Sequence, residues 1–316
     1  MRRMNKILLI GLSILCISKA SGQGLKPGEG YINVQGGRIW YRIVGSGNKP
    51  PLLLIHGGPG STSCSGIPGY SLLADERPVI FYDQLGTGRS DRPTDTTLWH
   101  VERFTDEVDS IRKALHLKEL HILGHSWGGV ILLEYMAKRS KGVKSAIFEG
   151  PLLSTPLWVR DADLLLKSMP RALQDTISKY ESLRFYDAPS YRAATDSFYA
   201  RHLTTKKRLI VGSDECDTVK GNEVVYKYMW GPTEFRCTGT LIDYDHSAYL
   251  RTITEPVLFI AGQFDEVRQE TMYEFQKMVP GSKVVITPEA GHMQILDQPL
   301  FLTNEIRIFM KGADRN

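Results

Sequence analysis

The chain has 316 residues, 42% hydrophobic and 23% charged, a composition ordinary for a folded globular protein that excludes disordered, collagen-like and coiled-coil chains. Its formal net charge of +4 comes from residues 1–20, which contain four basic residues and no acidic one. The rest of the chain is formally neutral, so composition gives no electrostatic argument for a nucleic-acid or anionic-membrane partner.

Residues 1–22 have the three parts of a secretory signal peptide. A basic start is followed by an apolar stretch over residues 7–17 and then by small residues that suit a cleavage site. The stretch is shorter than the roughly 20 apolar residues that span a bilayer. We therefore expect an exported protein, periplasmic or secreted. The alternative is a membrane tether through an uncleaved signal or a lipid on Cys16.

Short strands and helices alternate over residues 23–151. Residues 31–44 alternate between apolar and polar side chains, which predicts a hairpin that turns at Gly36 and Gly37. Continuous apolar runs predict strands buried on both faces, and a 3.6-residue apolar period predicts helices. These are strands at 51–55, 78–82, 119–123 and 144–149, and helices at 105–115, capped by Thr105, and at 130–139.

The alternation stops at residue 152 and resumes after Pro256. Residues 152–250 are rich in charged and aromatic residues and predict a mostly helical cap inserted into the fold. The chain then predicts strands at 257–262 and 283–287, a helix at 268–278, and a final helix opened by Asp297 and Pro299. We expect an α/β fold with a mostly parallel central sheet flanked by helices, built from residues 23–151 and 251–316.

The segment GHSWGG, residues 124–129, lies between a predicted strand and a predicted helix. That context is typical of the G-x-S-x-G nucleophile elbow, in which the chain turns sharply with the serine at the apex. Gly124 and Gly128 leave room for such a turn. The alternative is a glycine-rich turn without a chemical role. We predict that Ser126 is a nucleophile.

A nucleophilic serine needs a base and a group that orients the base, in the order serine, acid, histidine for this elbow. Asp265 and His292 each follow a predicted strand, at the sheet edge where α/β proteins place their sites. We predict that His292 takes and returns the serine proton and that Asp265 orients it. Glu149, after the strand 144–149, is the rival acid.

The loop HGGPG, residues 56–60, follows the strand 51–55 and has neither the spacing nor the lysine of a phosphate-binding loop. In an elbow-type hydrolase this loop supplies one amide of the oxyanion hole. We expect the amides of Gly58 and Trp127 to form that hole, with Gly57 as the alternative donor. His56 precedes the serine and is expected to order the loop.

The segment DQLGTGRS, residues 83–90, follows the next strand, 78–82. It predicts a structural turn that supports the glycine loop, with Asp83 as a minor candidate for the acid. Three cysteines follow the signal, of which Cys216 and Cys237 could pair in an oxidising compartment; all three could equally be small buried residues. Cys64 completes the set. No cysteine or histidine spacing predicts a metal site, and we expect no metal or cofactor.

These segments, together with GQFDE and AGHMQ around the acid and the histidine, resemble the proline iminopeptidase branch of the α/β-hydrolases. This branch includes the tricorn-interacting aminopeptidase. The resemblance covers residues 28–312, and the segment 229–245 resembles the family's return from cap to core. It implies an α/β-hydrolase fold and a serine aminopeptidase that releases an N-terminal residue, often proline, through an acyl-enzyme on Ser126.

Members of this branch hold the free α-amine of the substrate with acidic side chains. Carried over, this implicates Glu234, in GPTEF, and Glu266, beside Asp265. A buried ammonium group needs carboxylate partners, so the chemistry agrees. The alternative for each residue is a solvated surface carboxylate.

Other functions fit the same residues. An esterase, a lactonase or an amino-acid amidase would use the same serine, acid and histidine, but neutral esters need no acidic pair. A dehalogenase or epoxide hydrolase would need aspartate at position 126. An inactive hydrolase fold that binds peptides is the non-enzymatic alternative, although all three catalytic residue types are present.

Overall fold

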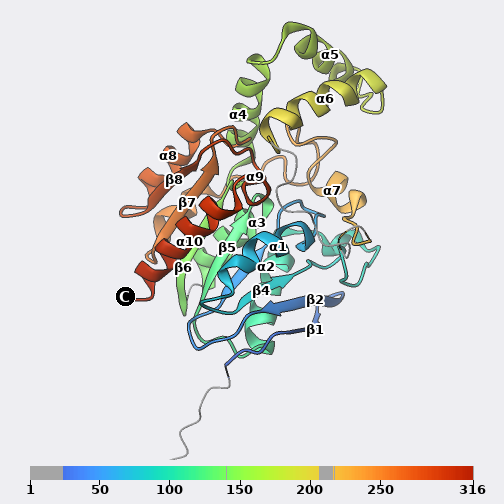
Figure 1. Ribbon diagram of the computed structural model, residues 1–316. Coiled ribbons are helices and arrows are strands. Elements are labelled where there is room, and N and C mark those ends of the chain that lie inside the picture. The colour runs from blue at the N-terminus through green and yellow to red at the C-terminus, as the bar shows by residue number, and fades with distance from the viewer. Residues whose placement is uncertain (1–23, 140, 206–215, 217, 316) are drawn as a thin grey trace, which may run out of the picture.

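The structure, a computed structural model, describes residues 24–139, 141–205, 216 and 218–315 (Figure 1). The predicted signal peptide and Cys16 lie outside these residues. An eight-stranded sheet forms the centre, in the order β1-β2-β4-β3-β5-β6-β7-β8. The strands are β1 (Gly28–Val34), β2 (Gly37–Val44), β3 (Leu52–Ile55), β4 (Val79–Tyr82), β5 (Leu120–His125), β6 (Val143–Glu149), β7 (Val257–Gly262) and β8 (Lys283–Thr287).

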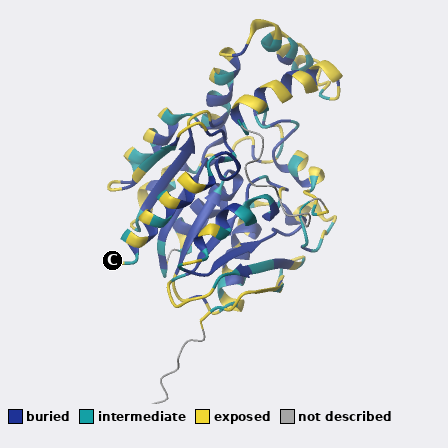
Figure 2. Ribbon diagram, in the orientation of Figure 1, coloured by how far each residue is buried: buried dark blue, intermediate teal, exposed yellow. Residues whose placement is uncertain are grey.

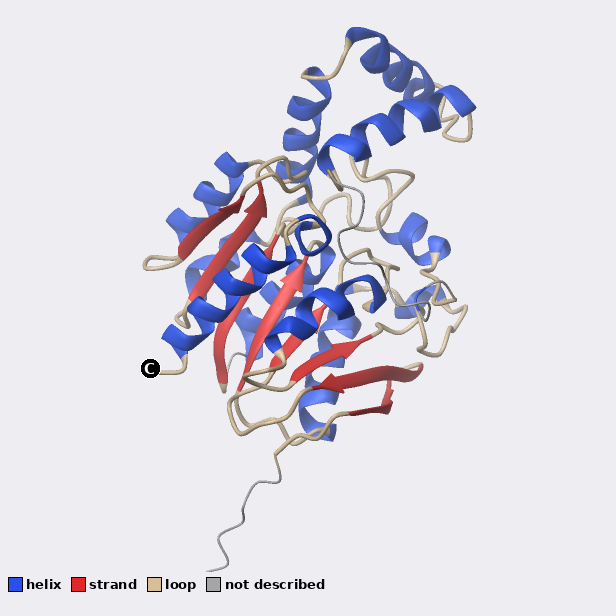
Figure 3. Ribbon diagram, in the orientation of Figure 1, coloured by secondary structure: helices blue, strands red, loops and turns tan. Residues whose placement is uncertain are grey.

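The pairings confirm the predicted mostly parallel sheet (Figure 3). Only β2 departs from this direction, because it pairs antiparallel with β1 and with β4. The hairpin register places Val34 opposite Gly37, so its turn residues are Gln35 and Gly36. The predicted turn at Gly36 and Gly37 was therefore wrong by one residue.

Alternate side chains of the strands enter two separate hydrophobic clusters, one on each face of the sheet. The central strands are buried along most of their length (Figure 2). In β3, Leu53 and Ile55 belong to the larger cluster with helices α2, α3 and α8, whereas Leu52 and Leu54 face α1, α9 and α10. Helices on both faces explain why these strands are continuous apolar runs. The bounds are α1 (Ile67–Tyr70), α2 (Val101–Ala114), α3 (Trp127–Arg139), α8 (Gln269–Met278), α9 (Gln294–Asp297) and α10 (Pro299–Ala313).

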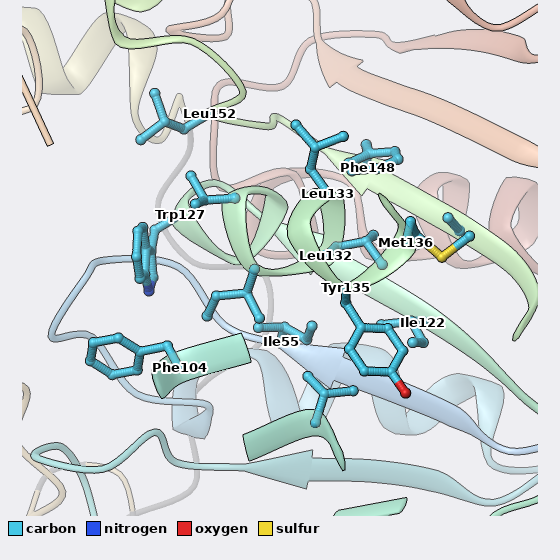
Figure 4. Packing of buried hydrophobic residues seen from close by; sticks show 14 of the residues in the cluster. Ile55, Phe104, Ile122, Trp127, Leu132, Leu133, Tyr135, Met136, Phe148 and Leu152 are labelled. Atoms are coloured by element: carbon cyan, nitrogen blue, oxygen red, sulfur yellow. The ribbon is translucent and has the colours of Figure 1, made fainter. Parts of the chain in front are cut away.

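Helix α3 is buried along most of its length, and its side chains interlock with β3, β5 and β6 (Figure 4). At its first residue, the Trp127 ring meets Phe104 of α2 edge to face, with 5.6 Å between ring centroids. This packing fixes the start of α3 relative to the sheet.

Helix α2 begins four residues before the predicted cap. Thr105 lies inside the helix, where its hydroxyl donates a hydrogen bond of 2.9 Å to the Val101 carbonyl. A threonine can satisfy its hydroxyl in this way within a helix as well as at a cap, which is why the predicted start was wrong.

Between β6 and β7, the described residues form four α-helices: α4 (Thr155–Lys167), α5 (Arg171–Ser182), α6 (Pro189–His202) and α7 (Glu223–Met229). Helices α4 to α6 rise above the sheet edge in Figure 1. They enclose a third hydrophobic cluster that includes Tyr191, Phe198 and Phe235. Within the described residues, no helix is both long and apolar enough to cross a bilayer.

Candidate active site

Ser126 stands at the junction of β5 and α3, where the strand turns into the helix. Its φ of 54° lies in the left-handed region, a strained conformation that is common at functional turns. The two glycines are required by close packing. A Cβ on Gly124 would lie 2.3 Å from the Gly128 carbonyl oxygen, and one on Gly128 would lie 2.3 Å from the Ile55 carbonyl oxygen. The sequence thus builds a tight elbow with Ser126 at its apex.

Asp265 and His292, from the loops after β7 and β8, form a buried pair. The Nδ1 atom of His292 lies 2.7 Å from Oδ1 of Asp265. The Asp265 carboxylate also accepts hydrogen bonds from the amides of Gly262, at 3.0 Å, and Val267, at 3.2 Å. These bonds fix the carboxylate, and the carboxylate in turn fixes the imidazole with its Nε2 free for chemistry.

The surroundings of His292 are strongly acidic. Its Nε2 has no hydrogen-bond partner among the described residues. Burial by itself would lower the pKa of His292, but the carboxylates of Asp265, Glu266 and Glu234 raise it to about 9. His125 packs against it with 4.7 Å between ring centroids, and burial lowers the pKa of His125 to about 3. The carboxylates around His292 thus favour its protonated form, whereas burial favours the neutral form of His125.

Glu149, the rival acid, does not contact Nδ1 of His292. Its carboxylate accepts a hydrogen bond from the Tyr70 hydroxyl, and burial raises its pKa to about 8. Its backbone carbonyl accepts a hydrogen bond of 3.0 Å from the Ser126 amide. Glu149 thus supports the elbow through its backbone.

The HGGPG loop is held by Gln84. His56 Nδ1 lies 2.8 Å from the Gly57 carbonyl oxygen, and the Gln84 amide donates to His56 Nε2 at 3.0 Å. The Gln84 side chain donates to the His56 carbonyl and accepts from Trp127 Nε1, both at 2.9 Å. One side chain therefore joins the glycine loop to the first residue of α3.

Asp83 also has a supporting position. Its Oδ1 accepts hydrogen bonds from the amide and the hydroxyl of Ser63, at 2.9 and 2.8 Å, and its Oδ2 accepts one from the Arg89 amide at 2.9 Å. With its oxygens engaged, Asp83 is not the partner of His292. The segment DQLGTGRS thus braces the loops around the site.

The predicted oxyanion-hole residues lie on either side of the elbow. Gly58 lines the same cavity as Ser126, and Trp127 follows Ser126 as the first residue of α3. The Gly58 amide has no hydrogen-bond acceptor in the described part of the chain. Gly57 approaches closely too, since a Cβ there would lie 3.0 Å from the Ser126 Cβ.

Glu266 is buried beside Asp265, and neither of its carboxylate oxygens has a partner among the described residues. Burial, and then the nearby Glu234, raise its pKa well above the usual range. Glu234, in the segment between α7 and β7, lines the cavity, and burial raises its pKa as well. Its backbone is fixed by the Tyr199 hydroxyl, 3.1 Å from its amide, and by Trp158 Nε1, 2.9 Å from its carbonyl.

The cavity measures about 540 Å³ and is roofed by residues 220–223. This roof is tied to the loops below, because the Asn222 amide donates to the Gly60 carbonyl at 2.7 Å and the Gly88 amide to the Lys220 carbonyl at 3.2 Å. No cluster of histidine, cysteine, aspartate or glutamate in the described ranges has the makings of a metal site.

A disulfide links Cys64, just after the glycine loop, to Cys216, just before this roof. The pairing of Cys216 with Cys237, which the sequence left open, is therefore excluded, and Cys237 is a buried free cysteine. The two partners are 152 residues apart in sequence, so no local spacing indicated the bond. The sequence likewise gave no signal for Tyr226, whose buried hydroxyl lies unpaired near Glu234.

Comparisons with known proteins agree with this fold. Residues 50–299 match the alpha/beta hydrolase fold family. A proline iminopeptidase from Heyndrickxia coagulans is 40% identical over 272 residues, which cover 86% of this chain and 94% of that protein.

Solved structures give the same result. The proline iminopeptidase of Mycobacterium smegmatis superposes with a TM-score of 0.82 at 28% identity, covering 91% of this chain and 99% of that one. The esterase RhEst1 from Rhodococcus superposes with a TM-score of 0.62 at 20% identity, covering 92% and 100%, and that likeness concerns the fold alone.

Proposed function

The chain belongs to the α/β-hydrolase family and is related to the proline iminopeptidases within it, and we propose that it is an exported serine aminopeptidase. It releases an N-terminal residue, above all proline, from peptides. The observation that carries the proposal is the acidic pair beside the histidine, formed by the buried Glu266 and the partly buried Glu234. Both oxygens of Glu266 are unpaired there, with Glu234 facing them from the cap.

The reaction begins at Ser126. His292 Nε2 takes the hydroxyl proton as the serine oxygen attacks the carbonyl carbon of the first peptide bond, and Asp265 stabilises the imidazolium that forms. His292 then gives this proton to the departing amine. The acyl-enzyme that remains on Ser126 is hydrolysed by a water molecule activated by the same histidine.

The negative charge that develops on the carbonyl oxygen is stabilised by the amides of Gly58 and Trp127. Losing one such donor typically costs about 100- to 1,000-fold in rate. The brace through Gln84 keeps these two amides in fixed relation, because its side chain binds both His56 in the glycine loop and the Trp127 ring.

Glu234 and Glu266 bind the ammonium group of the substrate. Without a cation, two neighbouring buried carboxylates repel each other and raise each other's pKa. A bound ammonium reverses this effect and supplies donors to the unpaired oxygens of Glu266. This pair therefore selects substrates with a free N-terminus and sets that terminus at a fixed distance from Ser126.

Export and the cap are further parts of the proposal. The signal-like residues 1–22 support export, as does the disulfide between Cys64 and Cys216, because such bonds persist in oxidising compartments. Residues 152–250 act as a cap over a core of residues 23–151 and 251–316, and Glu234 reaches the site from that cap. Detection of the processed protein in periplasmic or culture fractions, and not in the cytosol, tests export.

A panel of fluorogenic substrates tests the activity. We expect fast cleavage of prolyl amides, slower cleavage of alanyl amides, and little cleavage of N-blocked prolyl amides. The variant Ser126→Ala is expected to be inactive on all of them. Turnover of a short-chain ester alone would reject the aminopeptidase and favour an esterase or lactonase.

A further inference from the structure

The catalytic cavity has two chemically different ends. The cap end contains Glu234, Tyr226 and the roof residues 220–223. The opposite end lies in the core and is almost entirely hydrocarbon. We call it the apolar chamber, and its walls are Leu54, Tyr70, Phe81, Leu123, Met293 and Ile295.

Sheet register builds the chamber. Leu54 of β3 pairs in register with Phe81 of β4 on one side and with Leu123 of β5 on the other, so these side chains form one row across three strands. All three point to the face that α1, α9 and α10 cover. Leu123 is three residues before Ser126, which places the row directly beneath the elbow.

The opposite wall comes from α1 and α9. Tyr70 of α1 donates its hydroxyl to Glu149 and so turns an already satisfied polar tip away from any ligand. Ile295 of α9 packs tightly on α1, since a Cβ on Gly69 would lie 2.5 Å from its side chain. A charged side chain in the chamber would find no free partner on these walls, and such burial is costly.

The chemistry of the substrate indicates which of its side chains lies in the apolar chamber. In an N-terminal proline the side chain closes on its own amine, so ring and amine both belong at the cap end, beside the acidic pair. The carbonyl lies at Ser126, and the next residue must then extend away from the cap. We propose that the apolar chamber receives the side chain of the second residue and selects apolar residues there. This inference rests on the aminopeptidase function proposed above.

The selectivity should be measurable with a matched set of substrates: prolinamide, which has no second side chain, and Pro-Gly, Pro-Leu, Pro-Trp and Pro-Asp amides. One additional methylene group that fits an apolar pocket typically changes kcat/KM by about 10- to 200-fold. For the wild type we expect kcat/KM for Pro-Leu amide to exceed that for Pro-Gly amide by roughly 10- to 100-fold, and Pro-Asp amide to be the poorest.

Two variants of one wall residue shift the selectivity in opposite directions. Ile295→Phe fills the chamber and should lower the Pro-Leu to prolinamide ratio of kcat/KM about tenfold, whereas Ile295→Ala enlarges it and should raise the Pro-Trp to Pro-Leu ratio about tenfold. Leu302→Ala is the matched control, because Leu302 lies in the same hydrophobic cluster but does not line the cavity. It should leave both ratios unchanged, and thermal unfolding of each variant shows that it is folded.

The outcomes separate this inference from the function on which it rests. Cleavage of prolinamide and all prolyl amides at similar rates, with ratios that Ile295 variants do not change, overturns the chamber assignment and leaves the aminopeptidase intact. Failure to cleave any prolyl substrate overturns both. A rate that rises with acyl chain length on simple esters, and falls in Ile295→Phe, would assign the chamber to an acyl chain and overturn the assignment.

Discussion

The two sides of the catalytic cavity differ in whether their buried polar groups have hydrogen-bond partners. On the glycine-loop side, Gln84 and Asp83 have partners for every side-chain polar atom. On the acidic side, both oxygens of Glu266, the Tyr226 hydroxyl and His292 Nε2 have none in the part of the chain described. More than about nine-tenths of buried polar groups in proteins are paired, so a cluster of unpaired ones is informative.

We interpret the fully bonded side as structural support for the site and the unpaired side as the region that binds substrate. A fully bonded region holds backbone amides in place and contributes to stability. An unpaired buried carboxylate lowers stability and is retained where a ligand will pair it. Substitutions on the two sides should therefore have opposite effects on stability, even where both reduce activity.

The largest effect should come from the reacting groups on the unpaired side. Ser126→Ala and His292→Ala should each reduce kcat on prolyl amides by roughly 10⁴- to 10⁶-fold, and the double variant should be no worse, because the two residues act as one unit. Steady-state kinetics on purified single and double variants measure this. Additive losses would show that the pair does not act jointly.

The acidic pair should come next. Glu266→Gln and Glu234→Gln should each reduce kcat/KM for free-amine prolyl amides by about 10- to 150-fold, mainly through KM, while a neutral ester should not show this loss. Stability should stay equal or rise, because a desolvated carboxyl group without a partner cation is removed. Glu270→Gln, at an exposed carboxylate paired with Arg268, is the control. Equal losses on amine and ester would count against a role in amine binding.

Removing the hydrogen bonds of the Gln84 side chain should instead lower both stability and activity. Gln84→Leu keeps the volume but leaves His56 and the Trp127 ring without their partner, which should lower the free energy of unfolding by roughly 1–3 kcal/mol. Its kcat should fall to a similar extent on amides and esters, since the oxyanion hole serves both. Urea unfolding and the two rate assays measure this. Loss of amide cleavage alone would assign Gln84 to substrate recognition.

Sequence reasoning went furthest where function depends on local structure. The elbow around Ser126 needs two glycines at fixed spacing, and such a requirement is visible in six residues. That Asp265 and His292 lie together could be predicted because parallel strands end at one edge of the sheet, so that positions in sequence indicate positions in space. Their 2.7 Å contact follows from that topology.

The features that the sequence did not indicate depend on distant contacts. The disulfide joins Cys64 to Cys216 across 152 residues, and no spacing rule connects them. The apolar chamber arises because Leu54, Phe81 and Leu123 are in register, and each looks like an ordinary core residue in its own strand. The start of α2 was misplaced for a smaller reason, since Thr105 can bond within a helix as well as cap one.

The smallest expected effect is the change in the free energy of unfolding with pH, which depends on the unpaired side of the cavity. The pKa of His292 in the folded protein is about 9, above the roughly 6.5 of an unfolded histidine, so the folded state holds the extra proton between these values. Its stabilisation is complete below about pH 6.5 and is lost as the pH rises through about 9.

The carboxyl of Glu266, with its raised pKa, has the same sign, because its proton too is retained on folding. The free energy of unfolding should thus fall with rising pH, by up to about 1.4 kcal/mol per pH unit for each proton involved. Glu266→Gln should flatten this slope, since it removes one titrating group. Ser126→Ala should keep the wild-type slope. Urea unfolding from pH 6 to 9 gives the slopes, and an equal slope in Glu266→Gln would mean that the acidic pair is already paired in the free protein.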